Sequence, residues 1–339
     1  MCSSDLDPDP AMNHPDRVAW ELFVEANKPS SQAGKVLFET WYSDDDTFSA
    51  SATCPPGPFN PNLNLVAEAV AQFKLNTPAL LQLAPKKKGL VPHIVPGGGE
   101  EVRRNPVAHR FIVCNKLNTK AGLKAAFTAG KAISFPIASI EVKGEWIPVN
   151  GTINASNAHV GTVNGQQFAL VGLHVISKQV PNWTWATFEH QNNPGRCDYQ
   201  GCFDKFGATN HSVLPKSPAD GQYPACTKTA ALKKMFTDAN LEAVYENYCL
   251  KGSQTDFTTS SGLPVLVGNS TIEDGGINPS SCMTCHARAA FDKNGNALSM
   301  GMNQGAVDPN WFYSNPGKPT QKMNFMQADF VWAIPFKAK

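Results

Sequence analysis

Apolar residues recur at helical spacing in four parts of the chain. The clearest case is DRVAWELFVEAN, which KPSS ends, and another is TKAGLKAAFTAG, which ends at a glycine. The longest stretch, 226–252, has the pattern of one or two amphipathic helices. The pattern predicts helices over 16–27, 63–75, 119–130 and within 226–252.

Other stretches alternate or are continuously apolar, as strands are. Residues 138–149 alternate apolar and charged positions and then reach an Asn-Gly turn, while 182–190 is rich in aromatic and β-branched residues. The strands expected on these grounds are 108–117, 138–149, 167–177, 182–190 and 262–270. Several strands joined by short polar loops predict an α+β fold with an antiparallel sheet core, packed helices and long loops.

The remaining stretches are expected to be irregular. A short element over 34–46 ends in an acidic turn, residues 51–62 are proline-rich, and residues 85–106 form a basic, glycine-rich loop. The 26 glycines and 26 prolines agree with much loop. The net charge of +1 gives no reason to expect nucleic acid or an anionic membrane as a partner. No apolar run approaches the ~18 residues of a membrane span.

The most specific motif is SCMTCH at 281–286. Cys-x-x-Cys-His is the attachment signature of haem c, in which Cys282 and Cys285 bind the haem covalently and His286 is the proximal iron ligand. A structural zinc site needs four ligands, and the sequence holds no second CxxC pair and no His-x-His. A thioredoxin-like dithiol would open a helix after an N-terminal strand, a context that this motif lacks. We therefore expect one covalent haem c.

The sixth iron ligand is left open by the sequence. Methionines that follow the motif, as in small electron-transfer cytochromes, are Met300, Met302, Met323 and Met326. His174 lies in an apolar strand pattern on the same face as Leu170 and Ile176, and so resembles a buried ligand or a core histidine. His190, beside Glu189, is either part of a distal acid–base pair or a structural hydrogen-bonding group. An open site would permit ligand binding or peroxide chemistry.

The nine cysteines indicate the cellular compartment, because disulfides persist only where the environment is oxidising. Besides Cys2 and the motif pair, six remain, at 54, 114, 197, 202, 226 and 249. An even number in loop-rich sequence favours three disulfides, with 15 pairings open, over buried free thiols. We expect a periplasmic or extracellular protein. Residues 1–6, MCSSDL, are interpreted as translated sequencing adapter, so that the export signal is missing from this sequence.

Seven segments of the chain resemble a bacterial family of large, single-CxxCH proteins, the cytochrome c family. They are AWELFVEAN (19–27), FETW (38–41), IEVKGEW (140–146), LVGLHVISK (170–178), WTWATFEH (183–190), SCMTCH (281–286) and DFVW (329–332). The resemblance implies export and electron transfer, and it implies that His174 ranks above His190 as distal ligand. It supplies neither a substrate nor a sixth ligand.

These observations predict that the chain has two parts. Residues 7–260 are expected to form an α+β body with a Cys-rich loop at 191–226, and residues 261–339 a haem c-binding C-terminal segment packed on that body as one unit. The expected function is electron transfer with a redox partner protein or a small-molecule donor or acceptor. The alternatives are a haem enzyme, peroxidase- or oxygenase-like, with an open distal site, and a haem-based sensor or binding module.

Overall fold

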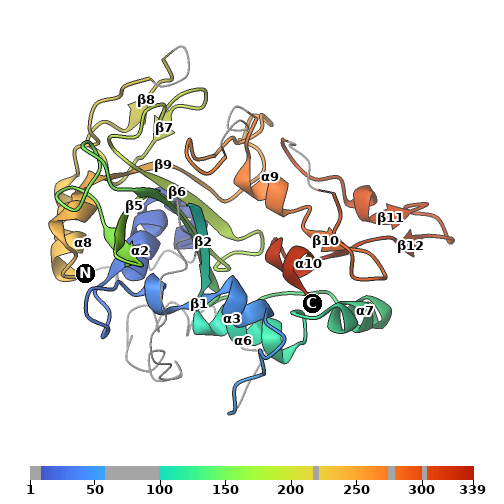
Figure 1. Cartoon of the computed structure of the whole chain (residues 1–339). Coiled ribbons are helices and arrows are strands. Elements are labelled where there is room, and N and C mark those ends of the chain that lie inside the picture. The colour runs from blue at the N-terminus through green and yellow to red at the C-terminus, as the bar shows by residue number, and fades with distance from the viewer. Residues whose placement is uncertain (1–8, 58–98, 217–220, 274–278, 300–303) are drawn as a thin grey trace, which may run out of the picture.

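The computed structural model describes residues 9–57, 99–216, 221–273, 279–299 and 304–339 (Figure 1). The helix expected over 63–75, the adapter-like residues 1–6, and both Met300 and Met302 lie outside the described residues. All helices and strands named below belong to the described residues.

A seven-stranded antiparallel sheet forms the centre of the molecule (Figure 1). Its order is β1-β2-β3-β5-β6-β9, and β4 pairs with β5 beside that path. The strands are β1 (Tyr42–Ser43), β2 (Gly99–Arg104), β3 (Ile140–Pro148), β4 (Val160–Val163), β5 (Gln166–Ser177), β6 (Thr184–His190) and β9 (Tyr248–Gln254). The sheet confirms the α+β class, and β3, β5 and β6 confirm three of the expected strands.

Eight α-helices surround the sheet within the described residues. They are α1 (Pro10–Asn13), α2 (Pro15–Asn27), α3 (Asp44–Phe48), α6 (Pro106–Cys114), α7 (Lys120–Ala129), α8 (Ala230–Asp238), α9 (Cys282–His286) and α10 (Ala333–Lys337). Small two-stranded pairs complete the fold: β7 (Cys202–Phe203) with β8 (Ser212–Val213), β10 (Ala290–Phe291) with β13 (Met326–Gln327), and β11 (Tyr313–Ser314) with β12 (Lys322–Met323). Single 3-10 turns lie at Phe38–Thr40, Ala243–Asn247 and Pro309–Phe312.

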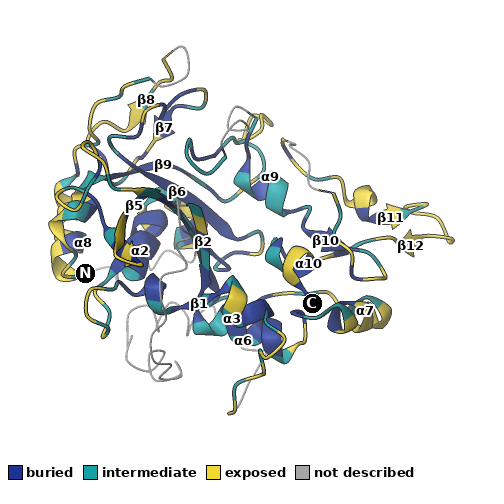
Figure 2. Cartoon of the chain, in the orientation of Figure 1, coloured by how far each residue is buried: buried dark blue, intermediate teal, exposed yellow. Residues whose placement is uncertain are grey.

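One face of the sheet packs on α2 and α8. Trp20 and Phe23 of α2 contact Phe188 of β6, with ring centroids 4.8 and 4.5 Å apart, and all three side chains are fully buried. Phe236 of α8 closes the same cluster. This face is a conventional apolar core, and its helix α2 is largely dark blue in Figure 2.

The opposite face is covered in part by α6 and the C-terminal residues. Ile176 of β5 and Trp185 of β6 share a second apolar cluster with Ile112 of α6, Met283 of α9 and Ile334 of α10. Residues far apart in the sequence therefore share one core.

The stretch 108–117 is a helix and not the expected strand. Its helix α6 begins at Pro106, and the side chain of Asn105 accepts a hydrogen bond from the backbone N–H of Ala108 at 3.0 Å. Asparagine at the N-cap followed by proline at the first helical position is a strong start signal. A short apolar run is ambiguous in its periodicity, and the cap decides it.

Three further expectations were wrong in part. Within 226–252 only Ala230–Asp238 is α-helical, and the stretch ends in strand β9, which pairs with β6 at the sheet edge. The expected loop 85–106 contains strand β2 in its described part. Residues 262–270 make isolated bridges, such as Val267 with Ser281, and no strand. Pairing with a neighbouring strand determines the conformation of β9 and of β2, and no local pattern reports it.

Three disulfides form, as expected from the even cysteine count. They join Cys54 to Cys114, Cys197 to Cys202, and Cys226 to Cys249. This number of disulfides fits an oxidising compartment. Among the described residues, no helix combines the length and the apolar character needed to cross a bilayer.

Candidate functional site

The CxxCH motif forms the short helix α9. Cys282, Cys285 and His286 all line one cavity, whereas Met283 and Thr284 are fully buried on the other side of the turn. This division follows from helical spacing, because residues three and four apart share a face. The cysteines of this motif are free, in contrast to the six other described cysteines.

Buried polar contacts fix α9 on the sheet. Gln254, at the end of β9, accepts a hydrogen bond from the backbone N–H of Met283 and donates one to the Ser281 hydroxyl. The Thr284 hydroxyl donates to the carbonyl of Gly305 at 2.7 Å. The backbone N–H of Cys282 donates to the carbonyl of Val267. The helix therefore has a defined position although it is a single turn.

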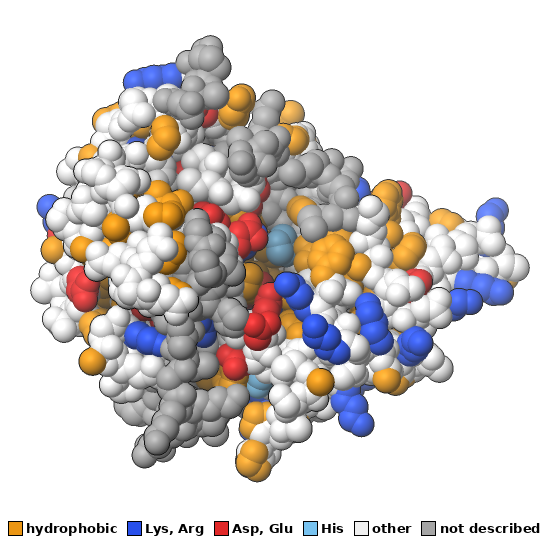
Figure 3. Space-filling model, viewed as in Figure 1, with side chains coloured by type: hydrophobic (Ala, Val, Ile, Leu, Met, Phe, Trp, Pro, Cys, Tyr) orange, Lys and Arg blue, Asp and Glu red, His pale blue; other side chains and the backbone are white. Residues whose placement is uncertain are grey.

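The cavity has a volume of about 710 Å³ and lies between the sheet and the C-terminal residues. Figure 3 shows acidic, basic and hydrophobic side chains gathered around a histidine on this face. Its apolar lining comes from Ile176, Trp185, Val267, Trp332 and Phe336. A volume of this size lies within the range of small-molecule and cofactor sites.

His286 is held in one orientation and one tautomer. Its Nδ1 donates to the carbonyl oxygen of Phe330 at 2.7 Å, because a carbonyl only accepts. The ring of Trp185 lies 4.6 Å from the imidazole, centroid to centroid. Burial lowers the pKa of His286 to about 4, so the ring is neutral at pH 7. Nε2 is then the nitrogen with a free lone pair, which is the form that binds a metal.

The two thiols do not have the character of metal-bound or nucleophilic thiolates. Burial raises the pKa of Cys282 well above its usual value and also raises that of Cys285. Reactive dithiols and zinc ligands sit where the thiolate is stabilised. The described residues contain no group of three or more His, Cys, Asp or Glu side chains placed to hold a metal ion. The raised pKa values of the two thiols weigh against zinc and dithiol chemistry.

His174 lines the same cavity as the motif, and it is paired there with Glu273. Its Nε2 lies 2.9 Å from Oε1 of Glu273. Burial acts to raise the pKa of Glu273, but the neighbouring His174, the backbone N–H of Asn269 and Lys143 together outweigh it, so the pKa lies below its usual value. The carboxylate accepts, and Nε2 of His174 carries the proton.

The prediction that His174 shares a face with both Leu170 and Ile176 was wrong for Leu170. His174 shares its face with Ile176 of the cavity, but Leu170 packs in the opposite core, beside α2. Between β3 and β5 the pairing moves from Glu145 with Gly172 to Trp146 with Leu170, which leaves Val171 as a bulge. A bulge shifts the alternation by one residue, so positions on its two sides no longer share a face.

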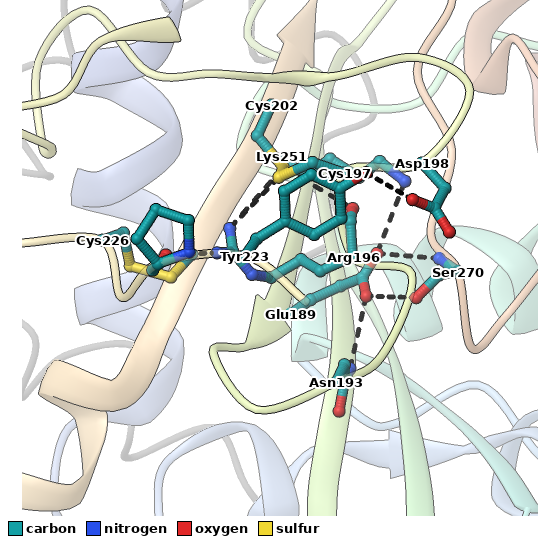
Figure 4. Close-up of a disulfide and its surroundings, with 12 residues drawn as sticks. Glu189, Asn193, Arg196, Cys197, Asp198, Cys202, Tyr223, Cys226, Lys251 and Ser270 are labelled. Atoms are coloured by element: carbon teal, nitrogen blue, oxygen red, sulfur yellow. Dashed lines mark hydrogen bonds and ion pairs between the residues drawn. A yellow bond between two sulfur atoms is a disulfide. The ribbon is translucent and has the colours of Figure 1, made fainter. Parts of the chain in front are cut away.

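A turn at 269–273 holds Glu273 in place, and β6 clamps that turn. Asn269 is fully buried and donates to the Thr187 hydroxyl at 2.9 Å and to the Phe188 carbonyl at 3.1 Å. Glu189 accepts from the backbone N–H and the hydroxyl of Ser270 (Figure 4). The backbone N–H of Asn269 donates to the second oxygen of Glu273.

Glu189 also belongs to a buried network on the side of the Cys197–Cys202 disulfide. Asn193 donates to it at 3.3 Å, and the Lys251 ammonium lies 3.6 Å away (Figure 4). Arg196 donates to both sulfurs of the disulfide. Glu189 therefore acts as a structural anchor of the 269–273 turn, the second of the two roles that the sequence left open for the Glu-His pair.

The other distal candidates lie away from the cavity. His190 is fully buried, with Nε2 bonded to the Asn157 carbonyl and Nδ1 accepting from the backbone N–H of Asn192. Met326 packs in the apolar cluster, and half-buried Met323 packs against its edge. The structure thus brings His174, Cys282, Cys285 and His286 together and keeps the other described candidates apart.

Sequence reasoning missed Glu273, Asn269 and Trp185 as parts of this site. Glu273 stands in a polar stretch, 99 residues after His174, and no spacing connects the two. The segment WTWATFEH did carry a signal for Trp185. Its alternate positions 185, 187 and 189 lie on one face, where Trp185 lines the cavity and the other two bond the turn at 269–273.

Comparison of the chain with protein-family models, with curated proteins and with solved structures finds no match.

Proposed function

We propose that this chain is an exported, single-haem c-type protein that transfers electrons. One observation carries the proposal. The two free thiols and the His286 ring line the same cavity of about 710 Å³, while the other six described cysteines are all in disulfides. The bacterial cytochrome c family that the sequence resembles implies the same function.

The residues of the cavity fit haem c in their chemistry. Cys282 and Cys285 would each add S–H across a vinyl group of the haem, and His286 would bind the iron through Nε2. Apolar side chains offer contact for the ring. Lys143 and Lys337 also line the cavity, where they pair with Glu100 and Asp44, and they would have to exchange these partners to bind the haem carboxylates. Bound there, haem would supply an iron that takes one electron from a redox partner protein or a small-molecule donor and passes it to an acceptor.

The proposed location is the periplasm or the extracellular space. Three disulfides form and persist in an oxidising compartment, whereas cytosolic thiols are kept reduced. The haem would then be attached after export.

Covalent attachment is the direct test. We expect the protein, produced in the periplasm with a haem-attachment system, to keep haem through denaturing electrophoresis. The double variant Cys282→Ser, Cys285→Ser should lose all of it, because no thioether can form. The control is Met323→Leu, a methionine outside the cavity in the same C-terminal segment, which should keep full haem staining. Haem that survives denaturation in the double variant, or zinc instead of haem in the wild type, would overturn the proposal.

A further inference from the structure

Two histidines line one cavity, and in each of them one ring nitrogen is hydrogen-bonded to an oxygen acceptor. His286 anchors Nδ1 on the carbonyl of Phe330 at 2.7 Å, and His174 anchors Nε2 on the carboxylate of Glu273 at 2.9 Å. In the described structure, neither the Nε2 of His286 nor the Nδ1 of His174 has a hydrogen-bond partner. Each ring of these two cavity-lining residues therefore has one nitrogen fixed by an acceptor and one nitrogen left without a hydrogen bond.

The anchor of His174 is a carboxylate, which is the usual orienting partner of a metal-bound histidine. Such a histidine donates its second ring N–H to a carboxylate or carbonyl, and this bond fixes the tautomer and makes the ring a stronger donor to the metal. Both oxygens of Glu273 are engaged, one by His174 and one by the backbone N–H of Asn269. The carboxylate is thus oriented before any ligand binds.

Close packing against the sheet leaves the turn that carries Glu273 little room to shift. A Cβ atom added to Gly172 would lie 2.5 Å from the hydroxyl of Thr271 and 3.0 Å from the side-chain oxygen of Asn269. Real Cβ atoms essentially never show a contact as short as the one with Thr271, so the turn rests directly on the backbone of β5. The same strand carries His174 two residues later.

Resting on the haem c site proposed above, we infer that His174 is the second axial ligand of the iron, through Nδ1, and that Glu273 is its positioning residue. His174 would be supplied by strand β5 of the sheet, and His286 by α9. Two histidine ligands give a lower reduction potential than a histidine–methionine pair, and a charged partner lowers it further by favouring the ferric state.

Spectroscopy of the haem-loaded protein tests this inference. The wild type should be six-coordinate and low-spin, and its ferrous form should not bind carbon monoxide. His174→Ala should become high-spin and bind carbon monoxide. Glu273→Gln keeps a hydrogen-bond acceptor but loses the charge, so it should stay low-spin with a midpoint potential shifted upward. His211→Ala, an exposed histidine, is the matched control and should match the wild type in every measurement.

Nitrogen-15 NMR of the ferrous, histidine-labelled protein gives a second measurement that does not depend on turnover. It should show the proton of His174 on Nε2. A low-spin spectrum in His174→Ala, an unchanged potential in Glu273→Gln, or a proton on Nδ1 would each overturn the inference. All variants keep Cys282 and Cys285, so haem retained on denaturing gels separates a failure of this inference from a failure of the haem c proposal.

Discussion

The two faces of the central sheet do different work, and β6 shows the contrast within three consecutive residues. Phe188 points into the aromatic cluster of α2 and has no exposed area. Thr187 and Glu189, on either side, point the other way and hold the turn at 269–273. Alternation along a strand makes such a division possible without any change of backbone.

The two faces of the sheet differ in role: one supplies most of the stability, and the other carries the residues around the proposed site. The face beside α2 buries aromatic and aliphatic surface, which is the main source of folding free energy. The other face carries His174, Thr187 and Glu189, whose polar atoms are bonded to groups from later in the chain. The second face borders the cavity that holds the CxxCH motif.

The largest effect is expected from truncation on the apolar face. Phe188→Ala should lower the free energy of unfolding by about 3–5 kcal/mol, since it removes a fully buried ring that contacts Trp20 and Phe23. Urea denaturation followed by circular dichroism measures the loss. Phe203→Ala is the control, because Phe203 is 45% exposed and its truncation should change stability by only about 0.5 kcal/mol. Equal losses in the two variants would contradict the assignment of Phe188 to the stabilising face.

A smaller effect is expected on the face of the site. Gly172→Ala should cost about 1–3 kcal/mol, because its methyl group would collide with Thr271 and Asn269. It should also perturb the absorption spectrum of the bound haem through Glu273 and His174. Gly252→Ala on β9, two strands away in the sheet, meets only Val267, at 3.6 Å, and should leave both stability and spectrum close to wild type. A haem spectrum that is unchanged in Gly172→Ala would show that the turn does not position the site.

The smallest effect concerns a charge on the apolar face. Lys228 is buried beside Trp20, and burial lowers its pKa to about 7. Between pH 7 and the unfolded value near 10.5, the unfolded chain binds the extra proton, so stability rises with pH. From pH 7 to 9 the wild type should gain about 2 kcal/mol relative to Lys228→Met, which cannot titrate. Parallel pH profiles of the two proteins would contradict a buried, titrating Lys228.

The sequence predicted the elements whose signals are local. The helix at 119–130 ends where expected, with Gly130 in the left-handed conformation at φ +63°. The alternation of 138–149 and the apolar run of 167–177 appear as β3 and β5. These elements follow from periodicity and from end signals that tertiary contacts do not override.

The errors fell where two structures compete for the same residues. Strand β9 has the sequence YCLKGSQ, which has few β-branched or aromatic residues, and its pairing with β6 decides its conformation. The run AHRFIVC is apolar enough for a buried strand, yet the cap at Asn105 and Pro106 makes it a helix. In both cases the deciding partner stands outside the segment.

The residues of the candidate site also fall into two groups, those that the sequence determined and those that the tertiary structure brought in. Cys282, Cys285 and His286 share a face because five consecutive residues make one helical turn, and this the sequence determined alone. The tertiary structure decided what stands around them. Glu273 meets His174 across 99 residues, and the bulge at Val171 sets which side chains of β5 face the cavity. Register between distant segments depends on the packing of the whole sheet, because a shift of one residue moves every side chain to the other face.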